Sequence, residues 1–239
     1  MEHKRDREGY LHGLLSSSSF EYTYSIAIFG CQAMSPRRYR SAVREAAANA
    51  THARIIAAAR MLLGAPKGIT GFSLDAVARK ARITRLTVYN QFGSRRALLE
   101  AVFDDMAARG GLHRIQEAMA VTDPHEALRC IIAIFCAFWS SNTAAMARLH
   151  AATASDPEFE VSIRGRNERR RRILSDIVRR MAIGRAVRAE SLRELTDILF
   201  ALTSLTFFAQ LMSRGRSAEA VCKAIHGLCD DAVRRAGLE

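Results

Sequence analysis

The feature that most constrains this chain is a helical spacing of apolar residues that starts near Arg40 and continues to the end of the sequence. Ile55, Ala59 and Leu62, for example, fall on one face at about 3.6 residues per turn. No window alternates apolar and polar residues as a half-buried strand does, and only 4 prolines interrupt the 239 residues. The sequence therefore predicts an all-α fold without a sheet.

The first 39 residues differ from the rest of the chain. They contain a serine run from Ser16 to Ser19, scattered aromatic residues and no helical period. We interpret residues 1–39 as a disordered or wrongly annotated N-terminal extension. In the second case translation starts at Met34 and the preceding residues are not part of the native protein.

The chain is strongly basic, with a formal net charge of +12 at pH 7. A basic chain of this kind usually meets a polyanion, either nucleic acid or an anionic membrane. Much of the excess lies outside any motif, because residues 161–188 contain ten Arg against one Glu and one Asp. We interpret this arginine cluster (164–188) as a solvated helix face, with DNA contact or an anionic ligand as alternatives. Net charge by itself is therefore weak support for DNA binding.

Several classes of protein are disfavoured. The 5 cysteines are widely spaced without a Cys-x-x-Cys pair, which is typical of reduced thiols in a cytoplasmic protein. No apolar run approaches the roughly 20 residues of a membrane span, and the apolar stretch at 26–29 is too short for an export signal. The common hydrolase, metalloprotease and phosphate-loop motifs are missing. We expect no enzyme activity and no catalytic, metal or cofactor site.

Capping residues divide the region after Gly64 into short helices. Ser73 is placed to cap one short helix, Thr84 a second that runs to Gln91, and Ser94 a longer third. Two short helices joined by a tight turn between longer helices form a helix-turn-helix bundle. The second short helix carries small and polar residues that suit the major groove of DNA, and 6 basic residues against one acidic lie between Phe72 and Arg96.

The run from Arg54 to Met106 resembles the DNA-binding domain of TetR/AcrR-type regulators. The stretches that carry the resemblance are 55–60, 72–78 and 83–99, and the most specific part is the block from Thr87 to Arg95. The resemblance implies three regions. These are the extension at 1–39, a helix-turn-helix DNA-binding domain at 40–96, and a larger helical ligand-binding and dimerisation domain at 97–239.

The resemblance also implies DNA contacts. Tyr89 and Arg95 match residues that grip phosphates, and Ser73 matches a helix start that touches phosphate. Positions that match residues facing bases or backbone are Thr84, Arg85, Thr87 and Asn90. The chain departs from the family at two places, because Arg82 replaces the usual glycine of the turn and Leu86 replaces a small residue. Arg82 is expected either to need a positive φ or to make the turn differ slightly, and Leu86 either contacts a thymine methyl group or restricts close approach to the DNA.

The second region is expected to form long helices at 124–141, 142–153, 156–181, 189–213 and 217–236. The resemblance implies that the last two pack against their copies in a homodimer and that the domain holds a ligand cavity. Candidate lining residues are Phe135, Phe138, Trp139, Met146, His150 and Phe207. An aromatic stripe at helical spacing is also typical of a plain core, so both interpretations stay open.

The sequence thus predicts a cytoplasmic, ligand-responsive transcriptional regulator, a repressor that binds a palindromic operator in double-stranded DNA as a homodimer. A small apolar molecule is expected to release it. The alternative is an Arg-rich helical adaptor or anionic-membrane-binding protein without sequence-specific DNA binding. A helical enzyme has less support, since the sequence offers no acid–base or metal set.

Overall fold

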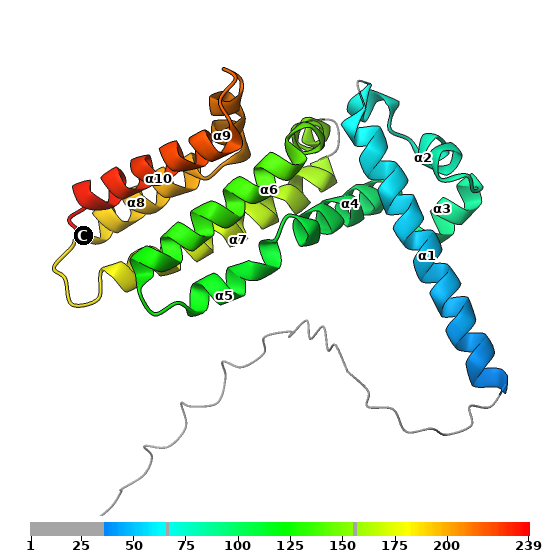
Figure 1. Ribbon diagram of the computed structural model, residues 1–239, viewed down its shortest axis with the longest axis horizontal. Helices are drawn as coiled ribbons and strands as arrows, with labels where there is room; N and C mark the ends of the chain where they lie inside the picture. Colours follow the sequence, from blue (N-terminus) through cyan, green and yellow to red (C-terminus); the bar gives the residue numbers. More distant parts are fainter. Residues whose placement is uncertain (1–35, 66, 155–156) are drawn as a thin grey trace, which may run out of the picture. The chain divides into compact units, whose positions relative to one another are not determined.

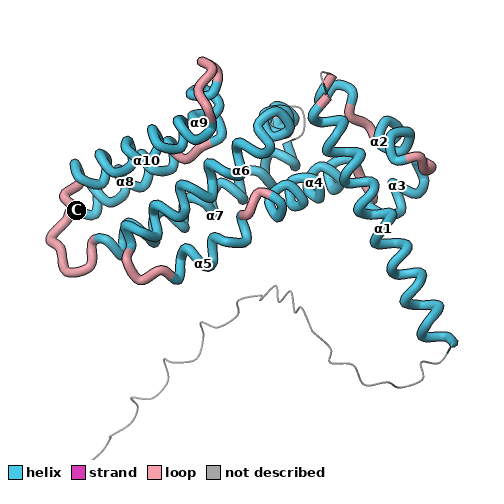
Figure 2. The backbone as a smooth tube through the Cα atoms, viewed as in Figure 1, coloured by secondary structure: helices cyan, strands magenta, loops and turns pink. Residues whose placement is uncertain are grey.

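The computed structural model of the protein describes residues 36–65, 67–154 and 157–239, and every regular element among them is helical (Figure 2). The predicted all-α fold is confirmed. Contacts divide the chain into two units between Ala42 and Val43. The contacts described below lie within the unit from Val43 to Glu239. The proposed extension and the alternative start at Met34 fall mainly outside the described residues, although residues 36–39 are helical.

The elements of the N-terminal half are four α-helices and two short 3-10 turns, followed by a short α5 (Figure 1). Their bounds are α1 Pro36–Gly64, η1 Gly68–Gly71, α2 Leu74–Ala81, α3 Arg85–Phe92, α4 Arg95–Arg109, η2 Leu112–Arg114 and α5 Ile115–Ala120. The C-terminal half contains α6 Pro124–Thr153, α7 Pro157–Met181, α8 Ala189–Leu202, α9 Leu205–Met212 and α10 Ala218–Arg235.

Side-chain caps start three of the helices where the sequence predicts them. The Oγ atoms of Ser73 and Ser94 accept hydrogen bonds from backbone N–H groups three residues on, at 3.1 and 3.0 Å, and Thr84 Oγ1 does the same at 3.1 Å. Thr51 is of a residue type that often caps helices, but it lies inside α1. Its hydroxyl donates to the Ala47 carbonyl oxygen at 2.9 Å, a bond that leaves the helix uninterrupted.

The turn between α2 and α3 depends on a left-handed residue. Arg82 has φ 54° and is the only non-glycine residue with positive φ in the described chain. This conformation lets the N–H of Ile83 bond to the Ala78 carbonyl oxygen at 3.0 Å and closes the helix end. Val77, Ala78 and Val88 are buried beside the turn, and the expected positive φ at Arg82 is confirmed.

Helix α6 is the centre of the C-terminal part and packs against α4, α5, α7, α9 and α10. The prediction of separate helices at 124–141 and 142–153 is wrong, because α6 is continuous. The polar residues near the predicted break form hydrogen bonds with carbonyl oxygens of their own helix. Ser140, Ser141 and Thr143 donate to carbonyl oxygens of the preceding turn at 3.0, 3.1 and 2.6 Å.

The opposite error occurs at 189–213, where one helix was predicted and two are found. Helix α8 ends at Leu202, and α9 starts at Leu205 with a bend of 48°. Ser204 caps α9 by accepting from Phe207 N–H at 3.1 Å. A serine inside an apolar helical pattern therefore acts here as a helix start, which spacing alone does not reveal.

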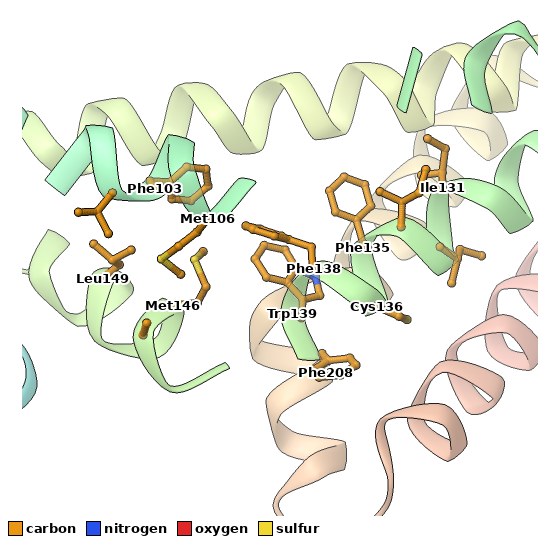
Figure 3. Packing of buried hydrophobic residues seen from close by; sticks show 14 of the residues in the cluster. Phe103, Met106, Ile131, Phe135, Cys136, Phe138, Trp139, Met146, Leu149 and Phe208 are labelled. Atoms are coloured by element: carbon orange, nitrogen blue, oxygen red, sulfur yellow. The ribbon is translucent and has the colours of Figure 1, made fainter. Parts of the chain in front are cut away.

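By length and composition α6 could cross a membrane, as could the bent pair of α8 and α9, which corrects the expectation that no apolar run approaches that length. The apolar side chains of α6 have another partner. Phe135, Phe138, Met146 and Leu149 are buried, and Figure 3 shows them gathered with residues of α4 and α9. Half of the apolar window is buried inside the protein, as expected for a core helix.

Replacing Arg82 with glycine is expected to stabilise the protein by roughly 0.5–1 kcal/mol, because glycine adopts the left-handed conformation without a Cβ clash. Urea unfolding of Arg82→Gly measures the gain. Arg172→Gly is the control, since Arg172 is exposed inside α7, where glycine costs about 1 kcal/mol. A loss of stability in both variants would contradict the strain at Arg82.

Position 110 requires glycine because of a neighbouring side chain on α6. Its backbone does not require glycine, because the φ of Gly110 is −78°. A Cβ atom there would collide with the Phe138 ring and lie 3.0 Å from the Met106 carbonyl oxygen. We expect Gly110→Ala to destabilise the protein by about 1–3 kcal/mol in thermal unfolding. Gly165→Ala is the matched control, since nothing lies near that position in α7, and it is expected to be neutral or stabilising.

Candidate functional site

Helix α3 presents a set of side chains to solvent. Leu86 and Tyr89 are 65% and 55% exposed, unusually high for large apolar residues. Arg85 and Asn90 are exposed on the same face of the helix. The opposite face anchors α3, because Val88 is fully buried. An exposed face of mixed polar and apolar character on a firmly packed short helix is suited to reading another surface.

A side chain of α1 packs against the C-terminal end of α3. The imidazole of His52 stacks on the Phe92 ring with centroids 4.6 Å apart, and its Nδ1 lies 3.3 Å from Gln91 Oε1. The sequence gives no signal for His52, because a lone histidine in a helix has no motif around it. Its role is visible only once α1 and α3 are seen together.

Four of the predicted contact residues already make bonds within the protein. The hydroxyls of Thr84 and Thr87 lie 2.8 Å apart and Thr84 also caps α3, while Ser73 caps α2. Arg95 Nε donates to the Phe72 carbonyl oxygen at 3.3 Å, and its guanidinium lies 5.6 Å from the centre of the Phe72 ring. These residues shape the helix starts on which the exposed face of α3 depends.

The surface around α3 is rich in exposed positive charge. Arg79, Lys80 and Arg82 are exposed, whereas Arg85 lies 3.5 Å from Asp75 in an ion pair open to solvent. Such a pair contributes little to stability, so Arg85 is available to another partner. Arg96 is less available, because it pairs with Glu158 on α7 and lies 3.9 Å from Glu100.

A second feature is a cavity of about 210 Å³ lined by residues of α4, α6, α7, α8 and α9. Its lining residues are Phe103, Trp139, Met146, Leu149, His150, Ile163, Arg166, Asn167, Arg170, Phe200, Ser204, Leu205 and Thr206. Three of the six predicted lining residues are present, namely Trp139, Met146 and His150.

The other three predicted residues do not line this cavity. Phe138 is fully buried and packs on the rings of Phe103 and Trp139, with centroids 6.0 and 4.6 Å away. The ring centroids of Phe135 and Trp139 lie 6.2 Å apart in a stacked arrangement, and Phe207 is half-buried on α9. Figure 3 shows Phe135 in the same group of buried side chains as Phe138 and Trp139. The aromatic stripe of α6 is therefore mainly core. The polar edge of Trp139 is also occupied, since its Nε1 donates to the Thr203 carbonyl oxygen at 3.0 Å.

Two arginines of the cluster at 164–188 point inward, which corrects the interpretation of that cluster as wholly solvated. Arg170 is only 6% exposed, and the Arg166 side chain is 19% exposed. The sequence held a signal for this. Phe159, Ile163, Arg166, Arg170 and Leu174 follow one another at intervals of three or four residues, so the two arginines occupy the inward face of α7.

Arg170 is held by uncharged groups. Its Nη1 donates to the Phe200 carbonyl oxygen at 3.1 Å and to Thr203 Oγ1 at 3.0 Å, and its guanidinium lies 4.1 Å from the Phe200 ring centre. Burial lowers the pKa of Arg170 to about 10, and the neighbouring positive charge of Arg171 contributes to the same shift. Arg170 therefore remains charged at neutral pH inside the protein.

Neither site has the groups of a metal centre. In the part of the chain that the structure describes, no three His, Cys, Asp or Glu side chains are placed to hold a metal ion. The arrangement offers an exposed reading helix in one region and a small cavity with buried positive charge in another.

Comparison with known proteins agrees with this arrangement. The profile described as bacterial regulatory proteins of the tetR family matches residues 55–102, which run from α1 through α4. No match was found among curated proteins. The TetR-family transcriptional regulator PfmR of Thermus thermophilus has a similar fold, with 22% identity and a TM-score of 0.57, covering 74% of this chain and 96% of its own.

A TetR-like transcriptional regulator of a Rhodococcus species is similar to the same degree, with 19% identity, a TM-score of 0.57, and coverage of 77% of this chain and 96% of its own. At these identities the two structures show a shared fold. The profile match falls on the helix-turn-helix and on the block from Thr87 to Arg95. Residues 55–102 thus match the helix-turn-helix domain of the tetR family, and the chain shares its all-α fold with TetR-family regulators.

Proposed function

We propose that the protein is a ligand-responsive repressor that binds a palindromic operator as a homodimer and leaves it when a small molecule fills the cavity. Residues 40–96 form its DNA-binding domain and residues 97–239 its sensing and dimerisation domain. The observation that carries the proposal is the exposed face of α3 inside the segment that matches the tetR profile. A DNA partner implies a cytoplasmic location.

The exposed residues of α3 have the chemistry for base readout. The guanidinium of Arg85 can donate two hydrogen bonds to a guanine, and the amide of Asn90 can bond an adenine. Leu86 offers an apolar surface to a thymine methyl group. Tyr89 on this face and Arg95 at the start of α4 can reach phosphates, and the helix starts at Ser73 and Ser94 favour anions nearby.

Dimerisation is assigned to α8 and α10, which pack side by side in the described chain (Figure 1). Leu228 on α10 is 42% exposed, and Ile198 on α8 is half-buried. Two such helices from each protomer can form a four-helix bundle about a twofold axis. The recognition helices must then lie about 34–36 Å apart, or a multiple of that distance, to enter successive major grooves.

Helix α4 links the cavity to the DNA-binding helices. Its start carries Arg95, which bonds to the carbonyl oxygen of Phe72 just before α2, and further along Phe103 lines the cavity and Asp104 pairs with Arg166 at 2.7 Å. A second link is Arg148 of α6, whose Nη1 donates to the Leu63 carbonyl oxygen at the end of α1 at 2.6 Å. An occupant that binds one arrangement of these contacts better than another shifts the position of α3.

The adaptor or membrane-binding alternative is not favoured, because much of the arginine cluster is used inside the protein. Arg164, Arg171 and Arg179 form ion pairs with nearby carboxylates. Arg180 donates to carbonyl oxygens of Met119, Val121 and Thr122, and Arg170 is buried. A surface for an anionic membrane would need these charges free.

Selection of random duplexes by the purified protein is expected to return an inverted repeat. Arg85→Ala and Tyr89→Ala should each weaken binding to that repeat by about 10- to 100-fold, since a good base contact contributes roughly 1–3 kcal/mol. Fluorescence anisotropy with a labelled operator measures the affinity at fixed salt. Arg169→Ala is the control, because this exposed arginine lies on α7 and its loss removes the same charge.

Three results would contradict the proposal: selection without a consensus, operator affinity of wild type in both α3 variants, or an equal loss in the Arg169→Ala control. The last outcome would indicate binding by general charge rather than by the α3 face.

Leu228→Glu is expected to place a charge in the dimer interface and to shift the protein towards monomers, with a parallel loss of operator affinity. Analytical ultracentrifugation gives the mass in solution. Val161→Glu makes the same change at a 61% exposed position on α7 and should leave the mass unchanged. A dimer as stable as wild type in the Leu228→Glu variant would exclude α10 from the interface.

A further inference from the structure

We propose that the cavity binds a small organic monocarboxylate, with its carboxylate beside Arg170 and Arg166 and its apolar body against the apolar lining residues. The effect of such a compound on DNA rests on the proposed function, whereas its binding does not. The sequence predicts an apolar effector, whereas the buried arginines favour an amphipathic anion.

The central observation is a buried positive charge without a counter-ion. Arg170 is only 6% exposed, and no carboxylate among the described residues forms an ion pair with it. The charged group that influences it is Arg171, which is also positive. Moving an unpaired charge out of water costs several kcal/mol, and the ring of Phe200 offsets only part of that cost.

Unused hydrogen-bond donors point to the same place. The Nε atoms of Arg166 and Arg170 are buried and have no hydrogen-bond partner among the residues that the structure describes, and both residues line the cavity. Buried donors of this kind are rare in folded proteins and usually mark a site for a ligand, ion or water. Two Nε–H groups spaced one helical turn apart on α7 can donate to the two oxygens of one carboxylate.

Charge balance selects a monoanion. Arg166 already has a partner, since its Nη1 lies 2.7 Å from Asp104 Oδ1. The cavity therefore lacks one negative charge, namely the one that would balance Arg170. A carboxylate supplies it, whereas a phosphate dianion would leave a surplus negative charge in a buried place.

The rest of the cavity selects a small apolar body. Phe103, Trp139, Met146 and Leu149 supply apolar lining, while Asn167 and Thr206 add polar groups. The volume of about 210 Å³ is below the roughly 300–1,000 Å³ of pockets that take drug-sized ligands. A single ring or short chain bearing one carboxylate fits this description.

The chain carries its own reporter for the test. Trp139 is the only tryptophan in the sequence and lines the cavity, so its fluorescence responds to an occupant. The probes are phenylacetate and its neutral isostere phenylacetamide, titrated into the full chain without DNA, with phenyl phosphate as a third arm. We expect saturable binding of phenylacetate, at least about 10-fold tighter than binding of the amide or the phosphate, since one lost charge-assisted hydrogen bond is worth about that factor.

The decisive variant is Arg170→Met, which keeps a long side chain and removes the charge. We expect phenylacetate binding to fall to the level of the amide. Because an unpaired buried charge is lost, the variant should melt at or above the temperature of the wild type, which establishes that it is folded. Arg172→Met, on the exposed side of the same helix, is the matched control and should bind phenylacetate as the wild type does.

Arg170→Lys adds a second test, because lysine keeps the charge but has no planar pair of donors. Its affinity for phenylacetate should lie between those of Arg170→Met and the wild type. The inference is overturned by equal binding of acid and amide, by tighter binding of phenyl phosphate, by no saturable signal with phenylacetate, or by full affinity in Arg170→Met. Duplex selection without a consensus would instead overturn the proposed function and leave this result standing.

Discussion

The structure depends above all on the burial of the apolar face of α6. Phe138 at its middle packs on Trp139 of the same helix and on Phe103 of α4, and it leaves no room for a side chain at Gly110. This contact sets where α4 lies, and α4 in turn carries the capped start at Ser94 next to α3. A reading helix of 8 residues cannot be stable by itself, so its position is inherited from the large core through α4.

Arginine has three different physical roles in this basic chain. At the surface around α3, arginine supplies positive charge that the carboxylates of the same chain do not fully neutralise. Along α7 it forms ion pairs and bonds to carbonyl oxygens that join neighbouring helices. At Arg170 it is buried against rings and dipoles. These roles carry different free-energy costs, which is why the net charge of +12 is a poor guide to what the protein binds.

The two sites share a structural connection because the helices that line the cavity also touch the DNA-binding helices. Phe103 and Asp104 lie on α4, and Arg148 extends from α6 to the end of α1. A partly buried ion pair such as Arg166–Asp104 responds to a new charge placed beside it, since charges interact more strongly where water is scarce. Packed helices have few alternative arrangements, so a small change at this pair is transmitted as a shift of a whole helix.

Local chemistry was readable from the sequence by itself. The caps at Ser73, Thr84 and Ser94, the left-handed Arg82 and the helix-turn-helix frame all follow from interactions within a few residues, and the structure has each of them. Tertiary structure alone decided the rest. It kept α6 continuous through a polar run, bent the chain at Ser204, moved Phe135 and Phe138 into the core, and turned Arg166 and Arg170 inward. The reason is that burial is a property of what packs against a side chain, and a helical period shows which residues share a face without showing what covers it.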